Sequence, residues 1–171
     1  MNTEWQIKKC DIEIVRELAY ELDIPQFIAR LLISRWVDTV KKANKFFNLD
    51  IKGLHNPMLL PDALKAIERI NKALDTGEKI FVWGDYDVDG ITSTAIIVTA
   101  LKKMGANLEY KVPHRIEDGY DIKLPSVDEA IYREAKLLLS VDCGILAFET
   151  AEYAKQCNLD LIITDHHHPS D

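Results

Sequence analysis

The sequence carries three aspartates at alternate positions, Asp85, Asp87 and Asp89, directly before Gly90. In an extended chain, side chains at alternate positions point to the same side, so this spacing predicts three carboxylates close together. Like charges at such short range repel unless a cation lies between them, and hard carboxylate oxygens suit Mg²⁺ or Mn²⁺. The spacing therefore predicts part of a divalent-metal site; solubilising loop residues and helix N-caps are the alternative.

A calcium-binding EF-hand loop begins with the same spacing of acids before a glycine. Such a loop needs a glutamate at its twelfth position, which is Ile96 in this sequence. It also needs a helix before the loop, whereas the apolar residues 80–83 are typical of a buried strand. Both requirements fail, so the EF-hand interpretation is excluded.

Two later apolar segments also end in polar residues that can bind metal. Asp142 follows the first of them, and Asp165, His166 and His167 follow the second. Because ligands of an open parallel sheet bind outside the carboxyl ends of its strands, we expect these side chains to meet the three aspartates at one edge. The added imidazoles favour Mn²⁺ over Mg²⁺.

An alternation of apolar runs and amphipathic segments predicts the elements that position these residues. Strands are expected at 79–83, 108–112, 137–141 and 161–164, and helices at 91–104, 127–135 and 145–156, with an earlier amphipathic helix ending at Gly77. Near-continuous apolar strands alternating with helices predict an α/β fold, a parallel sheet flanked by helices on both faces. Residues 1–55 have helical spacing and predict a small helical N-terminal region, so residues 56–171 form the chemistry-bearing domain.

The composition is that of one ordinary globular domain with an appendage. The chain has 171 residues, 47% of them apolar, and a formal net charge of −7. No apolar run reaches the roughly 18 residues of a membrane span, and no apolar signal segment opens the sequence, so a cytoplasmic protein is expected. The three cysteines form no C-x-x-C pair, which argues against a disulfide framework or a structural zinc site. The negative charge is weak evidence against nucleic-acid binding, because bound cations would cancel part of it.

Some further residues are candidates for binding phosphate or bases. Thr92 and Ser93 follow Gly90 at the expected start of a helix, where free N–H groups favour an anion; helix capping would explain these hydroxyls equally well. Arg115 and Lys111 follow the second strand and could meet a phosphate, although a solvated surface charge is the alternative for each. Tyr86 and Tyr120 could stack on bases or simply pack.

Three segments resemble the first three motifs of the DHH phosphoesterase superfamily: residues 84–93, 141–144 and 164–167. Residues 56–62 and 112–120 are similar to segments of RecJ-type single-strand-specific exonucleases within that superfamily. The resemblance runs from about residue 56 to the end of the sequence and is faint before it.

The resemblance implies a set of roles for the candidate residues. The metal ligands would be Asp85, Asp87, Asp89, Asp142 and His166. His167 would contact the scissile phosphate, and Asp165 would orient the histidines. Two Mn²⁺ or Mg²⁺ ions would promote hydrolysis of phosphodiester bonds. The implied activity is 5′→3′ removal of nucleotides from single-stranded DNA in recombination and repair, with single-strand-binding protein as a possible partner.

Two departures from the family pattern shape the expectation. The family's Tyr-Gly pair is Tyr120-Asp121 here, and the sequence stops at Asp171, before the family's fourth aspartate motif and second domain. We therefore expect the N-terminal part of a longer enzyme, with weak metal binding and little or no nuclease activity alone. The alternatives are a DHH phosphodiesterase acting on oligonucleotides or cyclic dinucleotides, and a non-catalytic DHH scaffold.

Overall fold

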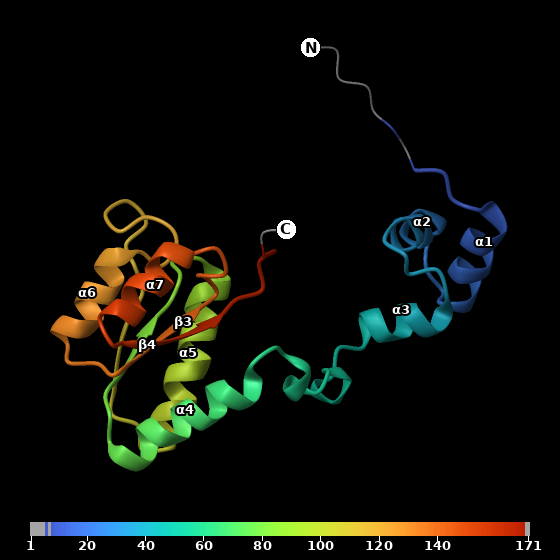
Figure 1. The fold of residues 1–171 in the computed structure, drawn as a ribbon. Coiled ribbons are helices and arrows are strands. Elements are labelled where there is room, and N and C mark those ends of the chain that lie inside the picture. The colour runs from blue at the N-terminus through green and yellow to red at the C-terminus, as the bar shows by residue number, and fades with distance from the viewer. Residues whose placement is uncertain (1–5, 7, 170–171) are drawn as a thin grey trace, which may run out of the picture. The chain divides into compact units, whose positions relative to one another are not determined.

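The computed structural model describes residue 6 and residues 8–169 of the chain. The chain forms two compact units, Met1–Leu59 and Leu60–Asp171 (Figure 1). Each unit has a hydrophobic core of its own. In the described part of the chain, no helix is long and apolar enough to cross a membrane.

The first unit is a small helical assembly. Its helices are α1 (Ile12–Glu21), α2 (Gln26–Ser34) and α3 (Val40–Phe47), followed by two 3-10 turns, Ile51–Gly53 and Pro57–Leu59. Asp11 caps α1 and Thr39 caps α3, each by accepting a backbone N–H of the first turn. The buried side chains of the helices form one core: Val15, Leu18, Ala29, Leu32 and Ala43. These helices lie within residues 1–55, where the sequence predicts helical structure, and the unit extends to Leu59.

The second unit is a parallel sheet flanked by helices. Its elements are α4 (Ala63–Thr76), β1 (Ile80–Trp83), α5 (Val88–Lys103), β2 (Leu108–Lys111), α6 (Leu124–Tyr132), β3 (Leu137–Val141), α7 (Phe148–Gln156) and β4 (Asp160–Thr164). The strand order is β2-β1-β3-β4, and every neighbouring pair is parallel. The predicted α/β fold with a parallel sheet is therefore confirmed.

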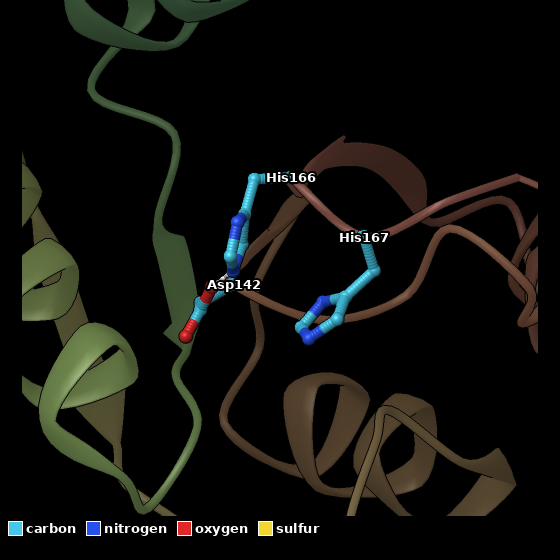
Figure 2. Close-up of side chains that lie close together, drawn as sticks. All are labelled: Asp142, His166 and His167. Atoms are coloured by element: carbon cyan, nitrogen blue, oxygen red, sulfur yellow. Dashed lines mark ion pairs between the residues drawn. The ribbon is translucent and has the colours of Figure 1, made fainter. Parts of the chain in front are cut away.

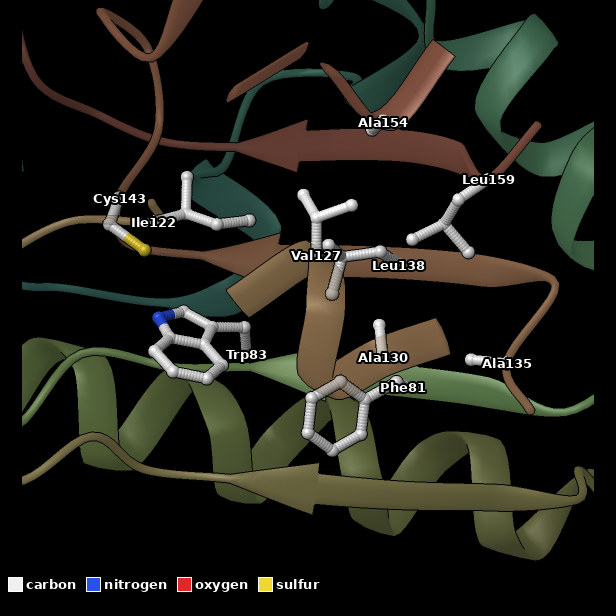
Figure 3. Packing of buried hydrophobic residues seen from close by; sticks show 10 residues of the cluster. All are labelled: Phe81, Trp83, Ile122, Val127, Ala130, Ala135, Leu138, Cys143, Ala154 and Leu159. Atoms are coloured by element: carbon white, nitrogen blue, oxygen red, sulfur yellow. The ribbon is translucent and has the colours of Figure 1, made fainter. Parts of the chain in front are cut away.

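Successive residues of a strand point to opposite faces of the sheet. Helices cover both faces, so every residue of the central strands is buried. On one face, Phe81, Trp83 and Leu138 pack against side chains of α6 and α7, which include Val127, Ala130 and Ala154 (Figure 3). On the other face, side chains of β1 and β3 pack against α4 and α5: Ile80, Val82, Leu137, Leu139 and Val141 meet Ala73, Val98 and Leu101. The strands that precede the candidate site are thus fixed from both sides.

Helix boundaries differ from the sequence prediction in ways that matter for the site. Helix α5 begins at Val88 and not at Ile91, because the Asp87 carboxylate accepts the N–H of Gly90 at 3.0 Å and caps the helix. Asp89 therefore lies in the first helical turn, and the prediction that it continues an extended segment is wrong. Helices α6 and α7 begin at Leu124 and Phe148, three residues earlier and three residues later than expected.

Candidate metal centre

The ends of three neighbouring strands deliver the polar side chains of the site. Asp85 and Asp87 follow β1, Asp142 follows β3, and Asp165 and His166 follow β4. The register aligns Trp83 with Ser140 and Val141 with Thr164, so the three strands end at nearly the same level. The meeting of these segments at the carboxyl edge follows from the parallel topology.

Two groups of side chains come close enough to hold a metal ion. One is Asp142, His166 and His167, and the other is Asp85, Asp87 and Asp142; within each group, one ligand atom per residue lies within 4.8 Å of the others. The Asp142 carboxylate belongs to both groups, and its Oδ1 lies 3.1 Å from His166 Nε2 (Figure 2). The geometry thus singles out Asp142 as the side chain that can serve two neighbouring positions.

Asp89 belongs to neither group in the described chain. Its place is on the wall of an open depression of about 390 Å³, together with Thr92, Ser93, Asp142 and His166. Asp89 therefore lies beside the candidate metal site, in the first turn of α5. The structure brings the other four predicted ligands together.

The carboxyl groups of Asp142 and Asp85 are buried, which disfavours their ionised form. Asp85 is 2% exposed and Asp142 is 7% exposed. Burial raises the pKa of both carboxyls above the usual value for aspartate, and the charge of Asp87 raises each further, although a backbone hydrogen bond opposes the shift at Asp85. Asp85 Oδ1 and Asp142 Oδ2 are buried with no hydrogen-bond partner among the described residues. Buried, unpartnered carboxylate oxygens beside imidazoles fit a bound divalent cation.

Asp165 holds His167 in place. Its Oδ1 lies 2.6 Å from His167 Nδ1 and accepts the His167 backbone N–H, while its Oδ2 accepts the N–H of Ile145. Burial alone would raise the pKa of Asp165, but these hydrogen bonds outweigh it and leave the pKa below its usual value. The hydrogen bond with Asp165 raises the pKa of His167 in turn. One carboxylate therefore fixes both the loop and the ring orientation, as carboxylates do behind metal-site histidines.

The hydroxyls of Thr92 and Ser93 bond within their own helix. Thr92 Oγ1 donates to the Val88 carbonyl at 2.7 Å, and Ser93 Oγ donates to the Gly90 carbonyl at 3.1 Å. The interpretation of these residues as N-caps is wrong, because Asp87 caps α5. Both side chains still line the depression, where their oxygens can accept or redirect a hydrogen bond.

The segment after β2 brings Arg115 and Tyr120 beside Tyr86, which follows β1. The Arg115 guanidinium lies 5.3 Å from the centre of the Tyr86 ring. The Tyr120 ring is 6.5 Å from that of Tyr86, and its hydroxyl is 3.5 Å from His167 Nδ1. Burial, followed by the charge of Asp165, raises the pKa of Tyr120 to about 12, so the phenol remains protonated near neutral pH. This segment faces the histidines and borders the site.

Lys111, the other basic candidate, has partners that sequence reasoning missed. Its Nζ lies 3.1 Å from Asp118 Oδ1 and 2.9 Å from Glu129 Oε2 on α6. Arg115 forms no ion pair within the described residues, so it is the basic side chain of this segment that remains available for a phosphate.

Asp118 was also missed, although it shapes the loop that carries Arg115 and Tyr120. Its Oδ2 accepts the His114 N–H at 2.7 Å, and its carbonyl accepts a hydrogen bond from Lys123 Nζ. The Asp118-Gly119 pair is typical of a turn in the sequence, but the bond back to the His114 amide is not encoded by that pair. Asp118 is therefore linked to His114 before it and to Lys123 after it in the loop.

Replacing Asp118 with alanine is expected to lower the free energy of unfolding of the second unit by about 2 kcal/mol, because charged hydrogen-bond partners are lost together. Thermal denaturation of the chain measures the change. Glu117→Ala is the matched control, since Glu117 is exposed in the same loop and only its backbone N–H bonds there, to His114. Equal losses in both variants would contradict the assigned role.

Comparison with known proteins adds a family context. Residues 79–171 match a family model described as the DHH family, N-terminal domain. The chain is 35% identical to the single-stranded-DNA-specific exonuclease RecJ of Bacillus subtilis, covering 96% of this chain and 21% of that protein. It is 36% identical to the protein of the same name from Escherichia coli, covering 100% of this chain and 29% of that protein. The chain thus spans less than a third of the length of these curated relatives.

Solved structures agree with this relationship. A crystal structure of exonuclease RecJ bound to manganese matches with a TM-score of 0.58 and 38% identity, covering 63% of this chain and 28% of that one. RecJ from Thermus thermophilus in complex with Mn²⁺ matches with a TM-score of 0.65 and 26% identity, covering 96% of this chain and 22% of that one. The fold and the sequence therefore agree on one family.

Proposed function

From the premise that this chain belongs to the DHH family, we propose that it is the metal-binding part of an exonuclease that degrades single-stranded DNA. The observation that carries the proposal is the Asp142 carboxylate, which belongs to both groups of ligand side chains. Relatives named as single-stranded-DNA-specific exonucleases, and related structures holding Mn²⁺, support the substrate and the metal.

We assign the metal positions to five side chains. Asp85, Asp87, Asp142 and His166 bind directly, and Asp89 contributes from the first turn of α5. Two bound Mn²⁺ or Mg²⁺ ions would neutralise phosphate charge and make a water nucleophilic near neutral pH. A carboxylate in both ligand groups supports a pair of ions, because one side chain can then bridge them.

The remaining side chains bind and orient the substrate. His167, held by Asp165, donates a hydrogen bond to the scissile phosphate. Arg115 binds a phosphate oxygen through its guanidinium, and the hydroxyls of Thr92 and Ser93 contact a phosphate at the wall of the depression. Tyr86 and Tyr120 lie beside Arg115 and His167, where their aromatic rings can stack on bases.

We further propose that the enzyme removes nucleotides in the 5′→3′ direction, acts in recombination and repair in the cytoplasm, and has single-strand-binding protein as a partner. Residues 1–55 then form a helical region that precedes a DHH domain continuing beyond residue 171. The length of the relatives supports this domain assignment, since this chain covers 21% and 29% of them.

The test places this chain in the Bacillus subtilis relative, in exchange for the 35%-identical segment. With Mn²⁺, the chimera is expected to degrade single-stranded DNA and to release label from the 5′ end before the 3′ end. The same chimera with Asp142→Asn is the control and should be inactive. Thermal denaturation and Mn²⁺ titration show that the chimera is folded and binds metal.

A folded, Mn²⁺-binding chimera that leaves single-stranded DNA intact would overturn the proposal. Hydrolysis confined to short oligonucleotides or cyclic dinucleotides would support the alternative DHH phosphodiesterase. This chain alone is expected to show little or no nuclease activity, and rapid degradation of single-stranded DNA by it would refute that expectation.

A further inference from the structure

Charge is segregated within the helical first unit. Residues 11–23, which include α1, carry five acids and one base, whereas residues 26–48, which include α2 and α3, carry five bases and one acid. The bases are Arg30, Arg35, Lys41, Lys42 and Lys45. The single acid, Asp38, is paired with Lys42 at 2.6 Å. The segment 26–48 therefore presents a basic surface on a chain whose net charge is −7.

The same segment exposes aromatic rings. Trp36 is 75% exposed, Phe46 is 52% exposed and Phe47 is 51% exposed. The two phenylalanine rings meet edge to face with their centres 5.6 Å apart. Lys8 Nζ lies 4.6 Å from the centre of the Trp36 ring, which adds a further cation beside it. Trp36 and the Phe46–Phe47 pair thus place exposed aromatic surface within a basic segment.

Helix α3 carries exposed cations and exposed rings around the one residue that it buries. Its Ala43 is fully buried in the core of the unit. Lys41 and Lys45 lie one helical turn apart on the side that points away from Ala43, whereas Phe46 and Phe47 follow Ala43 by three and four positions and flank it. No acid interrupts α3. The helix thus offers cations for phosphates on the side opposite Ala43 and exposed rings for bases beside it.

We propose that the exposed basic and aromatic side chains of residues 26–48, here called the basic–aromatic surface and including Arg35, Trp36, Lys41, Lys45 and Phe46, bind single-stranded nucleic acid. Positive grooves or faces with interspersed aromatic rings are the arrangement that holds single strands, because cations follow the backbone and rings stack on bases. Without bound metal, the second unit offers little attraction for a phosphate backbone, since residues 60–171 carry 12 basic and 20 acidic side chains. All side chains of the basic–aromatic surface belong to the first unit, and none of them is a proposed metal ligand.

The test measures binding of this chain to fluorescein-labelled oligothymidylate of about 16 nucleotides by anisotropy, in EDTA and across a salt series. For Lys41→Gln/Lys45→Gln, the slope of log affinity against log salt should fall by about 1.4, because two phosphate contacts are lost. Trp36→Ala should weaken binding by about fivefold to 150-fold at constant salt. EDTA keeps the result separate from the proposed hydrolase activity.

Matched controls lie elsewhere on the same chain. Lys102→Gln/Lys103→Gln removes the same charge from the exposed last turn of α5, and Tyr20→Ala removes an aromatic ring that is 84% exposed. Neither control should change the affinity or the salt slope appreciably. Circular dichroism and thermal denaturation check that each variant is folded.

Equal effects in the test and control variants would overturn the proposal, because binding would then follow total charge. Tighter binding of duplex DNA than of the single strand would also overturn it. No binding of the unaltered chain at low salt would overturn it as well, and the surface would then have another occupant, such as a protein segment. Loss of binding confined to the variants of the basic–aromatic surface would support it.

Discussion

Replacing Asp142 with asparagine is expected to weaken Mn²⁺ binding by this chain by at least about 100-fold without unfolding it. Replacing a residue that only supports a metal ligand already lowers metal affinity by about 10-fold to 100-fold. Asp142 belongs to both ligand groups, so its loss should have a larger effect. Asparagine has nearly the same shape and tolerates the left-handed backbone of this position, where φ is 64°. Isothermal titration with Mn²⁺ measures the loss.

The same variant should be more stable than the unaltered chain when no metal is present. Burial, and then repulsion from Asp87, raises the pKa of Asp142, so the native state binds its proton more tightly than the unfolded state does. Ionised Asp142 therefore destabilises the fold at neutral pH, and this penalty disappears as the pH falls through the raised pKa. In EDTA, the gain in melting temperature of Asp142→Asn should be largest near pH 7 and should shrink on acidification.

Asp75→Asn is the matched control for both measurements, since Asp75 is exposed on α4 and outside the ligand groups. It should bind Mn²⁺ like the unaltered chain and should show the same pH dependence. Unchanged Mn²⁺ affinity in Asp142→Asn would remove the basis of the metal assignment. A lower melting temperature of that variant in EDTA would instead show that the carboxylate supports the metal-free fold.

The meeting of the strand ends could be predicted from the sequence because it depends on topology alone. Apolar runs such as 137–141 can be buried on both faces only in a covered sheet, and parallel strands bring their carboxyl ends to one edge. Asp85, Asp142 and His166 therefore had to converge once the strands were recognised, whatever the details of their loops. The structure confirms that sheet.

The position of Asp89 could not be predicted in the same way, because it depends on one hydrogen bond. The alternation of three aspartates suggests an extended segment, but the Asp87 carboxylate accepts the Gly90 N–H and starts a helix within it. Lys111 poses a similar difficulty. Its side chain looks available in sequence, and its partner Glu129 is 18 positions away on α6. Such pairings depend on tertiary packing, which periodicity does not encode.

Replacing Gly90 with alanine is expected to destabilise the second unit by about 3 kcal/mol and to abolish metal binding with it. Gly90 lies in the first turn of α5, close to Asp85, which comes two residues after the end of β1. A Cβ at this position would overlap the backbone carbonyl group of Asp85. Backbone atoms in a buried strand end cannot move aside as a flexible side chain can, so the cost lies at the upper end of that for overpacked sites.

The sign of this result decides between two physical effects at Gly90. Helix propensity alone favours alanine over glycine by about 1 kcal/mol, so an unobstructed helix would become more stable. The close approach to Asp85 predicts the opposite, because α5 must move away and carry the Asp87 cap with it. Gly53→Ala is the control, since no atom lies within 4 Å of its added Cβ. Thermal denaturation and Mn²⁺ titration should show lower stability and lost metal binding for Gly90→Ala only. A Gly90→Ala chain that is more stable and still binds Mn²⁺ would mean that the close approach of Gly90 to Asp85 does not define the site.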